Sequence, residues 1–128
     1  MTKLIIEGSL PGLNEYTNAC RGSWASGASM KKVSQSIVST YIAKYLKGVK
    51  FERPVRLTFR WYEKNQMRDL DNVAFAKKFI LDALVQRGVL IDDGWRYVKG
   101  YRDEFYVDKK RPRIEVEFEE LESGQKES

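Results

Sequence analysis

Two stretches of the chain carry the clearest patterns of apolar and polar positions. In residues 55–63 every second side chain is apolar, a pattern typical of a strand with one buried face. Residues 29–47 repeat apolar side chains at helical spacing, which predicts a helix with Ser29 as its N-cap and Gly48 just beyond its end. The buried stripe of this helix has two alternatives: Val33, Ile37 and Tyr41, or Val38, Ile42, Tyr45 and Leu46.

A second helix is predicted after Asn72, which can act as its cap, and it ends at Gly88. The side chains predicted to be buried recur at the spacing of one helix face: Val73, Ala76, Phe79, Ile80, Ala83 and Leu84. By the same geometry, four other side chains share a different face: Asp71, Phe75, Lys78 and Asp82.

Shorter strand-like patterns lie at residues 3–8, 96–107 and 113–118. The polar turn 108–112 predicts that the last two strands form a hairpin. Residues 14–27 have no clear period, and we interpret them as a loop.

Residues 1–118 are therefore predicted to form a single domain, and residues 119–128 an acidic, disordered tail. A chain of 128 residues with 42% hydrophobic and 32% charged residues is long enough to bury a core. No apolar run approaches the length of a membrane span, and the first residues are too weakly apolar for a secretion signal. We expect a cytoplasmic protein.

Missing residue types exclude several kinds of chemistry. The chain has one cysteine and no histidine. An internal disulfide, a thiolate metal site and Ser-His or Cys-His catalysis are therefore excluded. Any chemistry must use carboxylates, amines, hydroxyls or a hard metal ion.

The charge is unevenly distributed along the chain. Residues 115–128 hold six acidic residues and one basic residue, so residues 1–114 carry 22 Lys and Arg against 12 Asp and Glu, or +10. Such a body should attract a polyanion, most plausibly nucleic acid. Five residues of the segment 14–27 suit contacts with a sugar-phosphate backbone or an exposed base: Asn14, Tyr16, Asn18, Arg21 and Trp24. Composition alone favours an ordinary surface loop.

Lys31 and Lys32 fall in the first turn of the first predicted helix, where the helix dipole disfavours cations but would help to bind a phosphate. Two solvated lysines are the simpler alternative.

Aspartates are concentrated in residues 68–95. If the backbone around Leu70 is extended, Asp69 and Asp71 project to one side and Leu70 turns inward. Such a close pair is unfavourable unless a cation or a proton intervenes, and its oxygen ligands suit Mg²⁺ or Mn²⁺.

Two further groups are candidates to join this pair. Lys78 shares a helix face with Asp71 and could reach a phosphate there, or it could simply form a surface ion pair with Asp82. If residues 88–93 run back beside the helix, Asp93 approaches Asp71 and completes a site of three carboxylates; if they run outward, Asp92 and Asp93 only form a turn.

The order of these motifs resembles the RusA family of Holliday junction resolvases, in the shorter version found in phage and prophage genomes of Gram-positive bacteria. The similar segments are residues 8–16 (GSLPGLNEY), the Lys31-Lys32 pair, residues 68–72 (RDLDN), residues 79–84 (FILDAL) and residues 88–95 (GVLIDDGW).

The resemblance implies a homodimeric α/β (α+β) fold, with a small mixed sheet of about four strands and two main helices. It also implies Mg²⁺-dependent resolution of four-way DNA junctions by paired symmetric nicks, in DNA recombination and repair. The family's three essential acidic residues match Asp69, Asp71 and Asp93, with Asp92 as the alternative third residue. Its essential lysine corresponds to Lys78 when counted back from Asp82, to Phe75 when counted forward from Asp71, and Lys77 is a third possibility.

On this hypothesis Asp69, Asp71 and Asp93 hold the ion and Lys78 stabilises charge on the phosphate. The DNA-binding residues are predicted to be Asn14, Tyr16, Arg21, Lys31, Lys32, Arg68 and Lys77. Three rival hypotheses remain: a nuclease acting on flaps or forks, a branched-DNA-binding protein without catalytic activity, and a purely structural protein whose aspartates bind no metal.

Overall fold

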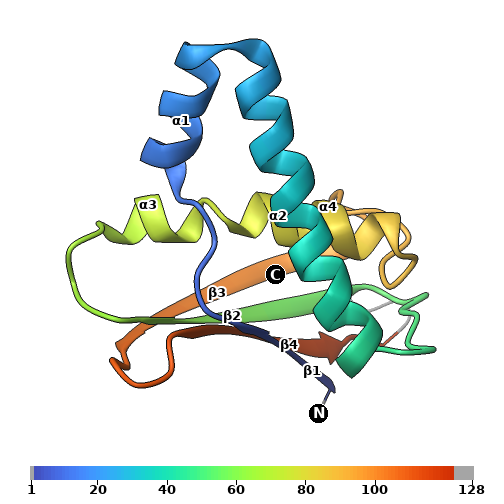
Figure 1. Ribbon diagram of the computed structural model, residues 1–128. Helices are drawn as coiled ribbons and strands as arrows, with labels where there is room; N and C mark the ends of the chain where they lie inside the picture. The colour runs from blue at the N-terminus through green and yellow to red at the C-terminus, as the bar shows by residue number, and fades with distance from the viewer. Residues whose placement is uncertain (1, 123–128) are drawn as a thin grey trace.

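The protein has two layers, a four-stranded sheet and a set of helices that cover one of its faces (Figure 1). The structure is a computed structural model, and it describes residues 2–122. In chain order the elements are β1 (Thr2–Glu7), α1 (Leu13–Gly22), α2 (Trp24–Tyr45), β2 (Val55–Glu63), α3 (Leu70–Ala74), α4 (Lys77–Gln86), β3 (Val98–Val107) and β4 (Arg113–Glu120). This confirms the mixed fold of helices and four strands. None of the helices within residues 2–122 combines the length and apolar character needed to span a membrane.

The strand order in the sheet is β1-β4-β2-β3. β4 lies antiparallel to both β1 and β2, whereas β3 lies parallel to β2. The predicted hairpin of residues 96–107 and 113–118 is therefore wrong, because β2 lies between these two strands. The helices between β2 and β3 return the chain to the same end of the sheet, so β3 pairs with β2 in parallel. A short turn can join only antiparallel strands. The turn 108–112 instead carries the chain past the end of β2, where the Asp108 amide donates to the Glu63 carbonyl at 2.7 Å.

The core lies between the sheet and the helices. Val55, Leu57, Phe59 and Trp61 of β2 are all buried, as their alternation predicts. Of the two possible stripes on α2, the second is the buried one, because Val38, Ile42 and Leu46 are inside while Val33 and Ile37 are exposed. The predicted buried residues of the second helix are also confirmed: Val73, Ala76, Phe79, Ile80, Ala83 and Leu84.

The N-terminal half differs from its prediction. Residues 14–27 are not a loop: α1 occupies most of them, and α2 already begins at Trp24. Ser23, not Ser29, caps α2, because its Oγ accepts a hydrogen bond from the Ser26 amide at 2.9 Å. No residue of α1 is fully buried, so it shows no wide apolar stripe in the sequence.

The second predicted helix is two helices, and it begins earlier than expected. Asp69, not Asn72, occupies the N-cap of α3, and two turn residues separate α3 from α4. Asn72 lies inside α3, where its buried side chain accepts a hydrogen bond from the Asn14 amide at 2.9 Å. That bond attaches α1 to α3, which explains why a good capping residue stands within a helix. Gly88 follows α4 with a φ of +77°, as expected for a glycine that ends a helix.

The end of the domain also lies further along than predicted. Glu119 and Glu120 belong to β4, where they face Arg56 and Val55 of β2. Leu121 is buried, and its amide donates to the Pro54 carbonyl at 2.8 Å. The predicted tail therefore begins after these residues, and its remainder at 123–128 lies outside the described residues.

The helix-free face of the sheet carries ion pairs that span neighbouring strands. Glu104 bridges two cations, at 3.0 Å from Arg60 and 3.2 Å from Arg102. Glu115 likewise pairs with Lys3 and Arg113, both at 2.7 Å. Many of the charges on this face are thus neutralised within the sheet.

Candidate active site

Asp69 and Asp71 lie where the chain leaves β2 and enters α3. Both carboxylates are exposed. Asp69 has an extended backbone at the N-cap, but the first helical hydrogen bond runs from the Val73 amide to the Asp69 carbonyl, so Asp71 is already helical. The prediction of two carboxylates on one side of an extended segment is therefore wrong. Leu70 does not turn inward either, because it is 59% exposed.

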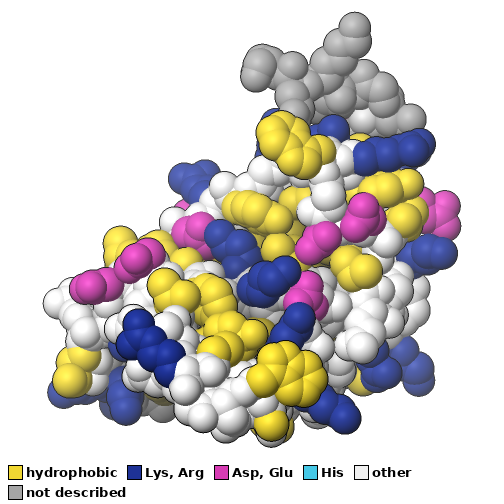
Figure 2. Space-filling model, turned by 90° about the horizontal axis from the view of Figure 1, so that it is seen from above, with side chains coloured by type: hydrophobic (Ala, Val, Ile, Leu, Met, Phe, Trp, Pro, Cys, Tyr) yellow, Lys and Arg dark blue, Asp and Glu magenta, His cyan; other side chains and the backbone are white. Residues whose placement is uncertain are grey.

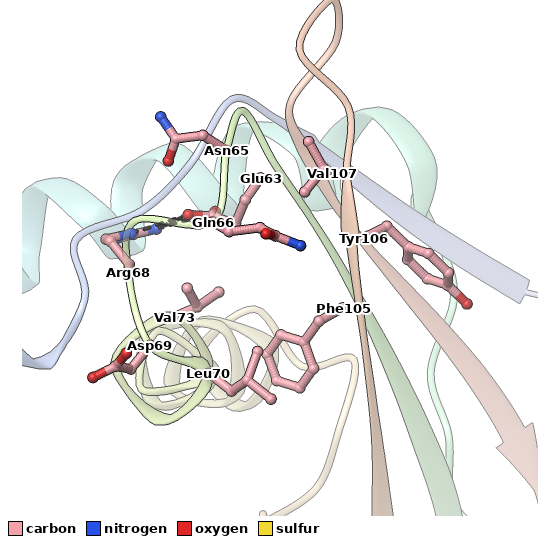
Figure 3. A pocket seen from close by; sticks show the side chains of 10 residues that line it. All are labelled: Glu63, Asn65, Gln66, Arg68, Asp69, Leu70, Val73, Phe105, Tyr106 and Val107. Atoms are coloured by element: carbon pink, nitrogen blue, oxygen red, sulfur yellow. Dashed lines mark hydrogen bonds and ion pairs between the residues drawn. The ribbon is translucent and has the colours of Figure 1, made fainter.

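A hollow of about 560 Å³ lies beside Asp69, between α3 and the end of β3 (Figure 3). In Figure 3, Leu70 and Phe105 lie close together, whereas the Asp69 carboxylate points away from them. The lining is Glu63, Asn65, Gln66, Arg68, Asp69, Leu70, Val73, Phe105, Tyr106 and Val107. The hollow thus combines an apolar wall with amide and charged groups.

Arg68 stabilises the segment that carries Asp69 and Asp71. Its guanidinium donates to Glu63 at 3.0 and 3.1 Å and to Glu15 at 3.0 Å. It also donates to the Leu10 carbonyl at 3.2 Å. Burial raises the pKa of Glu15, but hydrogen bonds from its own backbone and from Arg68 outweigh burial and leave that pKa lowered. Arg68 therefore connects β2, α1 and α3 with most of its donors already used.

Asp93 lies in the turn that precedes β3. It is half-buried, and its amide donates to the Asp92 carboxylate at 2.8 Å. Burial and the negative charge of Asp93 together raise the pKa of Tyr101. Asp93 therefore lies near the first half of β3.

The two aspartate groups lie near different residues of β3. Asp69 shares its hollow with Phe105, whereas the charge of Asp93 acts on Tyr101, four positions earlier in the strand. Within residues 2–122 no three acidic, His or Cys side chains come together as a group that could hold an ion. The donors suit Mg²⁺ chemically, but the described part of one chain does not assemble Asp69, Asp71 and Asp93 into a ready-made site.

The two adjacent lysines of α4 point to different surroundings. Lys78 is 62% exposed, and its Nζ lies 3.8 Å from Asp82, so the surface ion pair considered for it is present. The Nζ of Lys77 lies 2.7 Å from Asp103 and 4.7 Å from the centre of the Tyr101 ring. Lys77 is therefore held against the sheet, and Lys78 faces away from it.

Asp103 belongs to these surroundings but was absent from the sequence-based set. Its second carboxylate oxygen accepts a hydrogen bond from the buried Trp61 indole at 2.9 Å. Because β3 is parallel to β2, Asp103 pairs with Phe59 and so lies on the helix-covered face. The sequence pattern of β3 did not indicate its partner strand, and this placement could not be predicted.

The remaining predicted DNA-binding residues are spread over α1 and α2. Arg21 and Lys32 are exposed, and neither forms an ion pair within the described part of the chain. Tyr16 packs its ring against Phe75 in a tilted arrangement and against Phe79 edge-on, so much of its surface is used in packing. The thiol of Cys20 raises the pKa of Tyr16 through a hydrogen bond.

Lys31 and Lys32 lie in the middle of α2, because this helix begins at Trp24. The argument that placed them at a helix N-terminus is therefore wrong. Seen from above, the helical face carries Lys and Arg side chains interspersed with carboxylates and apolar groups (Figure 2).

These features together define a basic α/β protein with exposed carboxylates beside a helix start and a hollow at one end of its sheet. The chain matches the family model described as endodeoxyribonuclease RusA over residues 13–119. It therefore belongs to the RusA family of endodeoxyribonucleases, which act on Holliday junctions. A search of curated proteins gave no match.

Proposed function

We propose that this protein is a Mg²⁺-dependent, structure-specific endodeoxyribonuclease that resolves Holliday junctions by paired symmetric nicks, in DNA recombination and repair. The observation that carries this proposal is the family match across residues 13–119. The exposed pair Asp69 and Asp71 at the start of α3 gives that activity a chemically suitable centre.

Asp69, Asp71 and Asp93 would hold the ion, with Mn²⁺ as a possible substitute for Mg²⁺. The ion would supply Lewis-acid activation of the phosphate and of an attacking water. Lys78 would stabilise negative charge on the phosphate, for which its exposed amine is accessible. Arg68 would keep the two aspartates of α3 in place through Glu63 and Glu15.

A homodimer would fit both the substrate and the separation of the carboxylates. A four-way junction has two equivalent strands to cut, and a two-fold dimer offers two equivalent sites. Because the described part of one chain does not gather Asp93 with Asp69 and Asp71, a second copy could bring its own Asp93 beside Asp69 and Asp71. We therefore propose that each complete site combines residues of two subunits.

The DNA arms would run over the helical face. The unpaired cations Arg21 and Lys32 are the best placed of the predicted contacts, because each can offer all of its donors to a phosphate. The other predicted DNA contacts remain predictions, although each of these residues already has a partner within the protein: Asn14, Tyr16, Lys31, Arg68 and Lys77. A prophage origin and a cytoplasmic location also remain predictions.

The direct test is cleavage of a synthetic four-way junction in Mg²⁺ by the full chain. We expect two symmetric nicks, loss of cutting in EDTA, and a fall in rate of at least about a hundredfold in Asp71→Asn, because that change removes a charged ligand. Replicate reactions with flaps and forks test the alternative nuclease. Junction binding without nicks in any metal would instead favour a non-catalytic DNA-binding protein.

A further inference from the structure

Asp82 of α4 has contacts with three side chains from two helices. Its Oδ2 accepts a hydrogen bond from Gln35 of α2 at 3.2 Å and lies 3.7 Å from the Nζ of Lys31, also on α2. Its Oδ1 lies 3.8 Å from the Nζ of Lys78 on α4 itself. One carboxylate thus faces two ammonium groups, one near each oxygen.

The arrangement leaves both ammonium groups available to an anion. The distances of 3.7 and 3.8 Å are longer than hydrogen bonds, so each amine keeps its three N–H donors free for another acceptor. The side chains of Lys31 and Lys78 are 44% and 62% exposed, whereas that of Asp82 is only 24% exposed. Two cations around one carboxylate leave a net charge of +1 that faces solvent.

Stability alone gives a weak reason for this arrangement, because exposed ion pairs contribute little to it. Two free lysine side chains would repel each other and would lose rotamer freedom on binding a phosphate. The Asp82 carboxylate, which accepts a hydrogen bond from Gln35, keeps both lysine side chains near one point before the phosphate binds. The two side chains then lose less conformational entropy when the phosphate binds.

We propose that Asp82 is a positioning residue, whose carboxylate holds Lys31 and Lys78 together as one receptor for a phosphate group of the DNA backbone. This inference rests on the proposed nuclease function, in which Lys78 stabilises charge on the phosphate. It joins two lysines with separately predicted roles, one binding DNA and one acting in the reaction, into a single site between α2 and α4.

The test is the steady-state cleavage of a synthetic four-way junction in Mg²⁺ by Asp82→Asn. We expect kcat to fall about tenfold, because the amine of Lys78 is no longer held at the phosphate. KM should stay the same or decrease, because the substitution also removes a negative charge that repels DNA. Asp82→Glu, which keeps the carboxylate, should recover most of the lost kcat.

Glu104→Gln is the matched control. Glu104 is also a carboxylate that bridges two cations and is 25% exposed, but it lies on the helix-free face of the sheet. Its substitution should leave kcat within twofold of the parent, even if both variants lower the melting temperature by similar amounts. A purely structural role for Asp82 would make the two variants equivalent in kcat at a temperature where both are folded.

A double-mutant cycle provides a second measurement that does not depend on Asp82. If the two lysines form one receptor, Lys31→Met and Lys78→Met together should lower the cleavage rate by clearly less than the product of their separate effects. Fully multiplicative effects, or an unchanged kcat in Asp82→Asn, would overturn the inference while leaving the nuclease function intact. A parent protein that binds junctions but never cuts them would overturn both.

Discussion

Gly12, at the N-cap of α1, lies against Asn72 and Arg68, next to the candidate active site. A Cβ added there would lie 2.5 Å from the Asn72 Oδ1 and 2.6 Å from the Asn72 carbonyl oxygen. It would also lie 3.0 Å from the guanidinium of Arg68. No ordinary side chain fits at these distances, so only glycine permits the hydrogen bond between Asn14 and Asn72 that attaches α1 to α3.

We therefore predict that Gly12→Ala lowers the free energy of unfolding by about 1–3 kcal/mol, because backbone and buried side chain must both shift. It should also slow junction cleavage, since Arg68 and Asn72 lie beside Asp69 and Asp71. Urea denaturation measures the first effect. Gly22→Ala, at the other end of α1 where a Cβ meets nothing within 4 Å, is the matched control. Equal denaturation midpoints for the two variants would contradict the prediction.

Single residues also mark where sequence reasoning succeeded and where it stopped. The buried apolar side chains of β2 and of the second predicted helix were identified correctly, because burial on one face leaves a period in the sequence, whereas for α2 the sequence left two alternative stripes. Asp103 was missed because its importance comes from Trp61 and Lys77, which are distant in the chain. Leu70 was expected inside because extended backbone was assumed at a point where a helix begins.

At the scale of elements, the types of most segments were predictable but their partners were not. The pattern located all four strands, yet β3 and β4 were expected to pair and are separated by β2. The residues of a turn indicate that the chain reverses direction there. They do not indicate which strand the next segment pairs with, because that depends on which apolar faces remain uncovered. Short α1 escaped detection because it is stabilised by contacts such as Tyr16 with Phe79, not by a wide apolar stripe.

The ion pairs on the helix-free face of the sheet predict acid sensitivity. Burial raises the pKa of Glu115, but hydrogen bonds from Lys3 and Arg113 outweigh it, so the pKa lies below its unfolded value of about 4.5. The hydrogen bond from Arg111 similarly lowers the pKa of Glu7. A lowered pKa stabilises the fold above about pH 4.5, and that stabilisation is lost as the pH falls through the folded-state pKa.

We expect the melting temperature to fall steeply between pH 5 and pH 3 and to fall less steeply in Glu115→Gln, which cannot lose a proton. Differential scanning calorimetry across this range provides the measurement. Glu119→Gln is the control, because Glu119 is exposed and forms no ion pair among the described residues. An identical slope for the parent and Glu115→Gln would exclude the proposed origin of the acid sensitivity.

At the scale of the whole molecule, the candidate site is less complete than its sequence motifs indicated. The motifs identified a plausible set of acidic residues, but spacing along a chain cannot reveal that Asp69, Asp71 and Asp93 do not form one group within the described residues. If each site combines two subunits, as proposed, the missing information is the arrangement of a second copy, which no single-chain pattern contains.

Mixing two inactive proteins tests whether subunits share a site. Asp71→Asn and Asp93→Asn should each be inactive alone, but a mixed dimer retains one site with both intact aspartates if each site combines two subunits. We expect co-refolded mixtures to recover a measurable part of the parent's nicking activity on a four-way junction, with nicks mainly in one strand. No recovery in a verified mixed dimer would show that both aspartates must come from the same chain.

The position of β4 between β1 and β2 has a consequence for biosynthesis. Among the described strands, β1 pairs only with β4, the last of them in chain order. Residues 2–7 are therefore translated long before residues 113–120, the strand with which they pair. A nascent chain interrupted before residue 113 would leave Leu4 and Ile6 without the strand that shelters them, and so would be a natural target for chaperones and proteases.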